Sequence, residues 1–363
     1  MPSSPSTSSR PPSKRLSRRP GTSADTEALN TSTGHVAILG AGSWGTALGL
    51  LLCRNGHAVR LWGHEPGHIA QLCAEGENRQ FLPGFQFPPG LAPVADLGIA
   101  LSGVRDVLIV VPSHAFATLL IQLSELLPPG MGVAWATKGF EPGSGGLLHR
   151  VAAQILPGRD LAAVSGPSFA REVAQSLPTA VTVASPQPDY AQRVADLLHG
   201  ERFRAYVSDD IIGVQVGGGA KNVLAIAAGI ADGLGFGANT RAALITRGLA
   251  ELTRLGTVLG GKPETFMGLA GLGDLVLTCT DNQSRNRRMG LALARGLSME
   301  AAKAEIGQEV EGVITARAVH AMARGLGVEM PISEQVYGVL YEGVTPAQAT
   351  AALLERSSKA EFY

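Results

Sequence analysis

Apolar residues follow two different patterns along the chain, and the pattern changes near residue 207. From His35 to that point, short runs rich in Val, Ile and Leu alternate with stretches of helical spacing. Such alternation predicts βαβ units and a parallel sheet. We expect helices after the first run to Arg54, near 68–74 and near 116–126. The expected strands are VAILG, AVRLW, DVLIVV, GVAWATK, LAAVSG, TAVTVAS and RFRAYVS.

After Ser208 the strand pattern stops, and one helical stretch follows another from IIGVQVGGGAKNVLAIAAGIADGLG to PAQATAALLER. We therefore expect an α/β fold, with an N-terminal Rossmann-type parallel-sheet domain over 34–207 and an all-α C-terminal domain over 208–363. Residues 1–33 are rich in Ser, Pro, Thr and Arg, which predicts a disordered tail. Its basic residues could instead address an organelle or contact an acidic partner, but the apolar region of a signal peptide is missing.

Charge and cysteine content narrow the class of partner. The 30 basic and 30 acidic residues balance, so no net field attracts nucleic acid or anionic lipid, and we expect a small-molecule partner. The cysteines Cys53, Cys73 and Cys279 are too scattered for a disulfide framework or a zinc site, so we expect no metal and a cytoplasmic location. No apolar run approaches the roughly 20 residues of a membrane span without interruption by glycine or charge.

The motif GAGSWG follows the first expected strand directly and opens a helix. Gly40 permits a tight turn, Gly42 lets the backbone approach a pyrophosphate, and Gly45 lets helix and strand pack closely. The helix N-terminus adds unpaired N–H donors for the phosphates. Alone this motif is weak, because a glycine turn without a ligand looks the same. After the first strand of a βαβ unit it predicts a dinucleotide site.

The choice between NAD and NADP depends on the end of the next strand. A site that prefers NAD usually has an acid there, about 20 residues past the glycines, for the ribose hydroxyls. Here His64 precedes Glu65, and a histidine suits a 2′-phosphate better than a carboxylate does; Arg60 supports this more weakly. The alternative is that these are ordinary surface residues. The sequence therefore leans toward NADP, with NAD as the alternative cofactor.

Two further strand ends carry groups suited to an anion. Lys138 follows the strand GVAWAT, and SGPSFA, with Gly166 and Ser168, follows another strand and opens a short helix. Ligands of open parallel sheets bind at such carboxyl ends. The competing interpretations are a surface lysine and a plain strand-to-helix turn.

The expected helical domain contains an unusual lysine. Lys221 lies in VGGGAKNVLAIAAG, an otherwise uncharged helix in which an unpaired ammonium would be costly to bury. Asp274, the one acid in a glycine-rich apolar stretch, is a natural counter-charge, and Asn222 is a plausible orienting amide. Desolvation lowers a lysine pKa, so Lys221 could exchange a proton with a carbonyl or hydroxyl group. The alternative is a lysine that reaches solvent from the helix end.

Polar residues follow Asp274 abruptly, in the segment NQSRNRR with Ser284, Arg285 and Asn286. The planar guanidinium of arginine matches a phosphate, although a basic cluster is more often a solvated surface. Glu311, in EVEG, precedes a helical run, where an acid is favoured by the helix dipole even without a ligand.

These segments, taken in order, resemble the bacterial NAD(P)-dependent glycerol-3-phosphate dehydrogenases. The resemblance covers about residues 34–355 and implies a two-lobed cytoplasmic enzyme that forms a homodimer. It rests on GAGSWGTAL, LWGHEP, VPSHAF, WATKG, SGPSFA, GGGAKNVLAIAAG, FGANTRAALITRGLAE, GLAGLGDLVLTCT, NQSRNRR and EVEG.

The resemblance also implies roles for individual residues. Lys221 would be the acid/base. The residues implied to contact the cofactor are Ser43, Trp44, His64, Lys138, Ala170, Arg285 and Glu311. Those implied to hold glycerol phosphate are Lys138, Gly166, Ser168, Asp274, Ser284, Arg285 and Asn286. Two departures stand out: residues 1–33 have no counterpart in the family, and Glu309 stands where the family has an apolar cofactor contact.

The implied reaction is reduction of dihydroxyacetone phosphate by NADPH or NADH to sn-glycerol 3-phosphate, and its reverse, in support of phospholipid synthesis. One alternative is another two-domain hydroxyacid or ketopantoate-type dehydrogenase, against which the SRNRR segment argues. The other is a non-catalytic NAD(P)-sensing protein, which would have no need of Lys221 and Asp274 in apolar surroundings.

Overall fold

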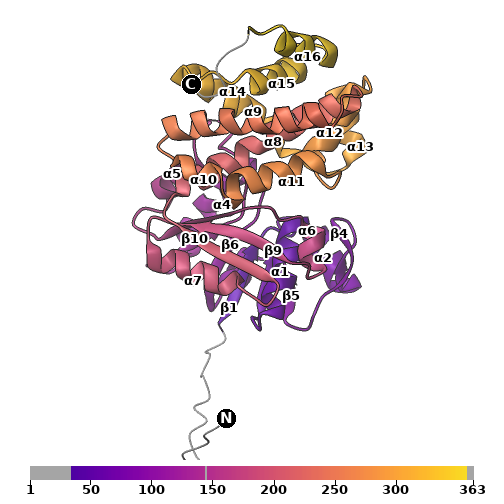
Figure 1. The fold of residues 1–363 in the computed structure, drawn as a ribbon. Helices are drawn as coiled ribbons and strands as arrows, with labels where there is room; N and C mark the ends of the chain where they lie inside the picture. Colours follow the sequence, from indigo (N-terminus) through magenta and orange to yellow (C-terminus); the bar gives the residue numbers. More distant parts are fainter. Residues whose placement is uncertain (1–33, 144, 358–363) are drawn as a thin grey trace, which may run out of the picture. The chain divides into compact units, whose positions relative to one another are not determined.

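Strands and helices alternate through the first half of the chain, as the apolar pattern predicts. The computed structural model describes residues 34–143 and 145–357; residues 1–33, expected to be a tail, lie outside them. Within the described residues one sheet has eight strands in the order β10-β9-β8-β7-β6-β1-β2-β5. In Figure 1 the sheet lies in the lower part of the view, and the orange and yellow helices that follow it in the chain lie above it. They are β1 (His35–Leu39), β2 (Val59–Trp62), β5 (Leu91–Val94), β6 (Val104–Ile109), β7 (Val133–Trp135), β8 (Leu161–Ser165), β9 (Thr179–Ala184) and β10 (Phe203–Ser208).

Helices cover both faces of this sheet. Successive strand residues point to opposite sides, and apolar residues on both sides are buried against helices. Ile38 belongs to a buried cluster with α1 and α7, whereas its neighbour Leu39 belongs to the cluster with α4 and α5. The strands are rich in β-branched residues that pack well on such surfaces. The helices of this half are α1 (Ser43–Arg54), α2 (Pro66–Glu75), α3 (Leu97–Leu101), α4 (Ser113–Leu126), α5 (Leu148–Ile155), α6 (Ala170–Ala174) and α7 (Pro188–Leu198).

Some of the sheet was not predicted. β8 and β9 pair antiparallel, so the sheet is mostly rather than wholly parallel. The hairpin of β3 (Glu77–Asn78) and β4 (Leu82–Gln86), the edge strand β5 and the short helix α3 were also missed. The segment 82–94 contains four prolines and two glycines, which weaken a strand pattern and are tolerated at a sheet edge.

The described residues after Ser208 contain helices and no strand, which confirms the expected change of class. Residues Gly34–Tyr363 nevertheless form one compact unit, so the division into two domains at residue 207 stays a prediction. The helices are α8 (Ile211–Gly233), α9 (Ala238–Val258), α10 (Pro263–Phe266), a π-helical turn (Leu269–Gly273), α11 (Asp274–Thr280), α12 (Arg285–Ala294), α13 (Met299–Ile306), α14 (Glu311–Leu326), α15 (Pro331–Tyr341) and α16 (Pro346–Leu354).

Helix α8 is the core element of this half and begins where the Asp210 carboxylate accepts a hydrogen bond from the Gly213 N–H at 2.8 Å. Contrary to the expectation from sequence, it is long and apolar enough to span a membrane by length and composition alone. However, 94% of its most apolar window is buried inside the protein. Its apolar character is therefore accounted for by the packing of α9, α11, α12 and α14 around it.

Helices α8 and α12 cross so closely that their backbones nearly touch. A Cβ atom on Gly229 would lie 2.1 Å from the Arg287 carbonyl oxygen, and one on Gly290 would lie 2.1 Å from that of Ile226. Real Cβ atoms cannot approach backbone this closely, so only glycine fits at the crossing. The crossing sets the position of the first turn of α12, which carries Arg285.

We expect Gly290→Ala to lower the free energy of unfolding by about 1–3 kcal/mol, because the added methyl group forces the two backbones apart. Gly325→Ala is the matched control, since it is also a helical glycine but its Cβ would meet no atom within 4 Å. The control should stabilise the protein by about 0.4–1 kcal/mol. Urea unfolding measures both, and equal effects would contradict the close crossing.

Candidate active site

A cleft of about 870 Å³ opens at the carboxyl ends of the parallel strands. Strand β1 pairs with β2 on one side and with β6 on the other, so the strand order reverses between β1 and β6. Ligands of open α/β sheets bind outside the strands at such a reversal. The opposite wall comes from α8 and from the first turn of α12. The cleft therefore lies between the sheet and the helical half.

The glycine-rich turn forms the floor of this cleft beside β1. Gly40 has φ +129°, and its Cβ would lie 2.5 Å from the Val110 carbonyl oxygen. A Cβ on Gly45 would lie 1.8 Å from the Gly40 carbonyl oxygen. Gly42 differs, because its Cβ would meet no atom within 4 Å and the residue lines the cleft. Two glycines thus close the turn, and the third leaves room for a ligand.

Two side chains at the start of α1 complete this region. The Ser43 hydroxyl donates to the Phe81 carbonyl at 2.8 Å, which ties the turn to the β3–β4 hairpin. Trp44 Nε1 is buried and has no hydrogen-bond partner within the part of the chain that the structure describes. Buried donors normally have a partner. An unpaired donor, free space over Gly42 and a helix N-terminus together fit the phosphates of a dinucleotide.

The structure separates the two residues considered for a 2′-phosphate. His64 is exposed at the cleft, with Nε2 3.5 Å from the Glu65 carboxylate. Arg60 points elsewhere: its guanidinium donates to the carbonyls of Ile99, at 2.8 Å, and Ser102. The suggested part of Arg60 in cofactor choice is therefore wrong, because α3 and the residue that follows it bind this side chain. No sequence pattern had predicted α3.

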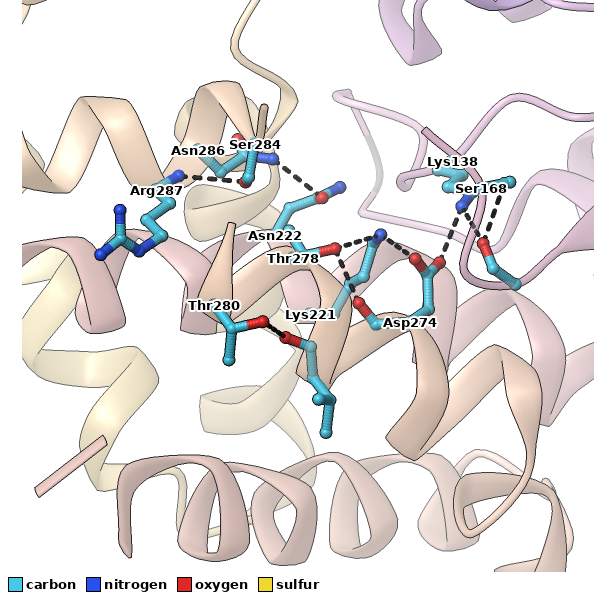
Figure 2. Close-up of polar contacts among 12 residues, drawn as sticks. Lys138, Ser168, Lys221, Asn222, Asp274, Thr278, Thr280, Ser284, Asn286 and Arg287 are labelled. Atoms are coloured by element: carbon cyan, nitrogen blue, oxygen red, sulfur yellow. Dashed lines mark hydrogen bonds and ion pairs between the residues drawn. The ribbon is translucent and has the colours of Figure 1, made fainter. Parts of the chain in front are cut away.

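A buried carboxylate joins the sheet half to the helical half (Figure 2). Asp274, 1% exposed at the start of α11, accepts hydrogen bonds from Lys221 on α8 and from Lys138. The distance from Lys138 Nζ to Asp274 Oδ2 is 2.7 Å. Lys138 also donates to the Gly166 carbonyl at 2.9 Å, which in turn accepts the Ser168 hydroxyl at 3.0 Å. The two lysines thereby share one counter-ion at the cleft.

Lys221 is almost completely buried, at 6% exposed, yet it lines the cleft. Burial lowers its pKa to about 8, although the Asp274 carboxylate opposes this shift. Its ammonium donates to Asp274 and, at 2.7 Å, to the Thr278 hydroxyl. Because an ammonium has three donors, one N–H remains for a ligand. Lys221 is therefore a cation held near the pH range in which it can exchange a proton.

Thr278 was missed from the sequence. The Thr278 hydroxyl donates its hydrogen to the Asp274 backbone carbonyl at 2.7 Å. This bond fixes the orientation in which the hydroxyl oxygen accepts from Lys221. The available signal was spacing, since residues four apart share a helix face. The π-helical turn that precedes Asp274 is another feature often found at functional sites.

Amide groups line the opposite wall of the cleft. Asn286 donates to the Asn222 side-chain oxygen at 2.9 Å and accepts from the Gly312 N–H at 2.8 Å. The Ser284 hydroxyl caps α12 by accepting from the Arg287 N–H at 3.2 Å. Both asparagines and Ser284 line the cleft. The bonds of Asn286 to Asn222 and to Gly312 connect α12 to α8 and to α14.

The arginines of the NQSRNRR segment divide between the cleft and the protein interior. Arg285 lines the cleft, and burial lowers the pKa of its guanidinium while Glu311 opposes that shift. Arg287 instead pairs with Asp232 at 2.5 Å and does not line the cleft. Arg288 lines the cleft as well. The basic segment is thus not a uniform solvated surface: Arg285 and Arg288 line the cleft, and Arg287 anchors α12.

Glu311 links the two halves on the far side of the cleft. Its carboxylate accepts from the Ser113 N–H at 2.9 Å and from the Ser113 hydroxyl at 2.8 Å, at the start of α4. Burial raises the pKa of Glu311, and the Ser113 bonds oppose this. Ser113 was not predicted from the sequence to belong to the site. Glu309, which stands where the family has an apolar residue, is exposed and lines the cleft.

The structure brings most of the sequence-predicted residues to one cleft. Those that line it are Gly40, Gly42, Ser43, Trp44, His64, Lys138, Ser168, Ala170, Lys221, Asn222, Ser284, Arg285, Asn286 and Glu311. Gly45, Gly166 and Asp274 lie behind this wall, where they contact residues that line it.

Comparison with known proteins gives a consistent result for both halves. The N-terminal model of NAD-dependent glycerol-3-phosphate dehydrogenase matches residues 35–191, and the C-terminal model matches residues 210–351. A glycerol-3-phosphate dehydrogenase (NAD(P)+) from Pseudoalteromonas translucida is 56% identical over 335 residues, which is 92% of this chain and 100% of that protein. One from Thioalkalivibrio sulfidiphilus is 58% identical over 328 residues, 90% of this chain and 98% of the relative.

A solved structure shows the same relationship. The crystal structure of glycerol-3-phosphate dehydrogenase from Coxiella burnetii superimposes with a TM-score of 0.87 at 52% identity, covering 89% of this chain and 99% of that one. Because identity above half persists over nearly the full length of these relatives, the chain belongs to the NAD(P)-dependent glycerol-3-phosphate dehydrogenase family.

Proposed function

We propose that this chain catalyses the reduction of dihydroxyacetone phosphate to sn-glycerol 3-phosphate with NADPH or NADH, and the reverse reaction. The observation that carries this proposal is the Lys221 ammonium, held by Asp274 and Thr278 in a cleft shared with the glycine-rich turn and Arg285. The product is the backbone of glycerophospholipids, so the enzyme would support phospholipid synthesis.

Lys221 is the proposed general acid. When bound, the reduced nicotinamide supplies a hydride to the carbonyl carbon. The remaining N–H of Lys221 gives its proton to the carbonyl oxygen, while Asp274 and Thr278 hold the nitrogen in one orientation. In the reverse direction neutral Lys221 takes a proton from the hydroxyl group. Lys138 compensates the charge of the Asp274 carboxylate whether Lys221 is protonated or neutral.

Arg285 is the proposed phosphate ligand. It stands in the first turn of α12, where unpaired backbone N–H groups and the helix dipole add to the attraction for an anion. The bond between Arg287 and Asp232 supports this role by anchoring the same turn. Asn222 and Asn286 are suited to the substrate hydroxyls. Their mutual hydrogen bond uses the side-chain oxygen of Asn222, so the NH₂ group of Asn222 stays available to a ligand in the cleft.

The cellular setting is also a proposal. We infer a cytoplasmic homodimer in which 34–207 and 208–363 act as two domains that bind cofactor and substrate between them. The described cysteines form no disulfide, which supports a reducing compartment. Light scattering of the purified protein measures the oligomer, and a monomer would overturn the dimer.

The absorbance of reduced nicotinamide, followed with dihydroxyacetone phosphate, tests the proposed reaction. We expect turnover with both cofactors, and kcat/KM with NADPH at least equal to that with NADH. The reason is that His64 stands after β2, at the position where a site that prefers NAD usually has an acid for the ribose hydroxyls. Turnover of a 2-oxoacid in place of the phosphate ester would favour the ketopantoate-type alternative. Cofactor binding without any turnover would favour a sensing protein.

We expect Lys221→Met to lower kcat by about 10²- to 10⁴-fold, since it removes the proton donor and keeps an apolar stem in α8. Asp274 retains Lys138 as its partner, so no buried charge is left unpaired and the variant should fold. NADPH affinity, measured by fluorescence, should change little. Retention of more than about a tenth of the parental kcat would remove Lys221 from the proposed role.

The pH profile of the reduction should report Lys221. The group must be protonated to act as an acid, so kcat/KM should fall as the pH rises through its pKa of about 8. Asp274→Asn removes the charge that raises this pKa. The variant should be less stable, because its two lysines lose their counter-ion, and in its folded fraction the alkaline fall should move to lower pH. An unchanged position of the fall in that variant would show that another group titrates.

Arg285→Ala should reduce kcat/KM for dihydroxyacetone phosphate by about 10- to 100-fold, the effect of losing a charge-assisted hydrogen bond. Unphosphorylated dihydroxyacetone is the control substrate, because it has no phosphate for Arg285 to bind. An equal loss on both substrates would mean that Arg285 does not recognise the phosphate.

A further inference from the structure

The β3–β4 hairpin is joined to the glycine-rich turn by one fully buried side chain. Asn78, 0% exposed, donates from Nδ2 to the Ala41 carbonyl at 2.9 Å and to the Thr46 hydroxyl oxygen at 2.8 Å. Its Oδ1 accepts from the Phe81 N–H at 3.1 Å. A carbonyl can only accept and a backbone N–H can only donate, so these two partners fix the orientation of the amide.

The contact with Ala41 determines where the next backbone donor points. The peptide bond between Ala41 and Gly42 is trans, so its C=O and its N–H point in opposite directions. Asn78 holds the carbonyl on the hairpin side. The Gly42 N–H therefore points away from the hairpin amide, and no described residue accepts a hydrogen bond from it. Gly42 itself lines the cleft, in the open space left by its missing side chain.

Backbone hydrogen bonds hold the groups on either side of this peptide: the Gly40 N–H donates to the Trp62 carbonyl at 2.9 Å, and the Gly42 carbonyl accepts from the Thr46 N–H at 3.0 Å. Within the described residues, however, no backbone group bonds the Ala41 carbonyl or the Gly42 N–H. Gly40 and Gly42 flank Ala41, and glycine adopts a wide range of φ and ψ angles. If the peptide turned over, the partial negative charge of the Ala41 oxygen would face the phosphates instead of a donor. The restraint must come from outside the turn, and Asn78 is the side chain that supplies a hydrogen bond to Ala41.

We propose that Asn78 is a positioning residue for the dinucleotide, which locks the Ala41–Gly42 peptide so that the Gly42 N–H faces the pyrophosphate. The inference rests on the proposed function, since it takes the cleft to bind NADPH or NADH. The hairpin also accepts the Ser43 hydroxyl at Phe81, so the same anchor holds a second group of the cofactor wall. Asn78 itself does not line the cleft and acts through the backbone.

Asn78→Ala tests this by direct binding. We expect the Kd for NADPH and for NADH, followed by the fluorescence of the reduced nicotinamide, to rise about 10- to 100-fold, the effect of one lost hydrogen bond to a charged group. ADP-ribose, which keeps the pyrophosphate and lacks nicotinamide, should weaken by the same factor. At saturating cofactor, kcat and the KM for dihydroxyacetone phosphate should stay within about threefold of the parent.

Two further variants separate positioning from stability. Thr46→Val is the matched control: it removes the other acceptor of Asn78 Nδ2 and leaves the bond to Ala41, so it should lower Tm without weakening NADH binding. Asn78→Asp keeps the size and the Oδ1 acceptor but loses the amide donor, so near neutral pH it should weaken binding as Asn78→Ala does.

The outcomes distinguish failure of the positioning role from failure of the proposed function. Equal loss of NADH binding in Thr46→Val and Asn78→Ala, unchanged binding in the Asn78 variants, or failure of both Asn78 variants to fold would overturn the positioning role alone. A parent protein that binds neither NADPH nor NADH would overturn the proposed function, and the positioning role with it.

Discussion

The Asp274 carboxylate is the interaction on which the arrangement of this molecule depends. It lies 1% exposed between two ammonium groups, one on the loop after β7 and one on α8. Removing a buried counter-ion is strongly destabilising because it leaves uncompensated charge in apolar surroundings. The cluster therefore constrains how the helical half meets the carboxyl ends of the sheet. It also leaves Lys221 desolvated, with a pKa lowered to about 8 despite the neighbouring carboxylate.

Close backbone packing makes this cluster possible. A Cβ on Gly217 would lie 2.5 Å from the Ala270 carbonyl oxygen, so α8 also approaches the π-helical turn before Asp274 closely, although less closely than it approaches α12. Side chains as short as Asp274 and Thr278 can then reach Lys221. The close crossing of α8 and α12 likewise brings Arg285, in the first turn of α12, to the cleft. The glycines of α8 thus serve the site by bringing helices together rather than by contacting a ligand.

Polar side chains restrain the parts of the cleft that glycine leaves free. Asn78 restrains the glycine-rich turn, the Ser113–Glu311 pair connects α4 to α14, and Asp232 anchors α12 through Arg287. In each case the restraining group comes from an element distant in sequence. Contacts that lie mostly behind the cleft surface therefore hold its lining residues in place, and such preorganisation reduces the entropy cost of binding a ligand.

The sequence by itself determined the alternation of most strands and helices, the change to helices after Ser208, the glycine-rich turn and the pairing of Lys221 with Asp274, but not β3, β4, β5 or α3. These follow from local rules: periodicity reports which face is buried, and a lone charge in an apolar helix requires a counter-charge. Tertiary structure alone decided that Lys138, 136 residues from Asp274, shares that carboxylate, and that Arg60 and Arg287 bind protein groups instead of a ligand. It also decided the antiparallel β8–β9 pair and the contact of Asn78 with Ala41. The physical reason is that a sequence pattern specifies which groups need partners, whereas only the packed fold specifies which partners lie within hydrogen-bond distance.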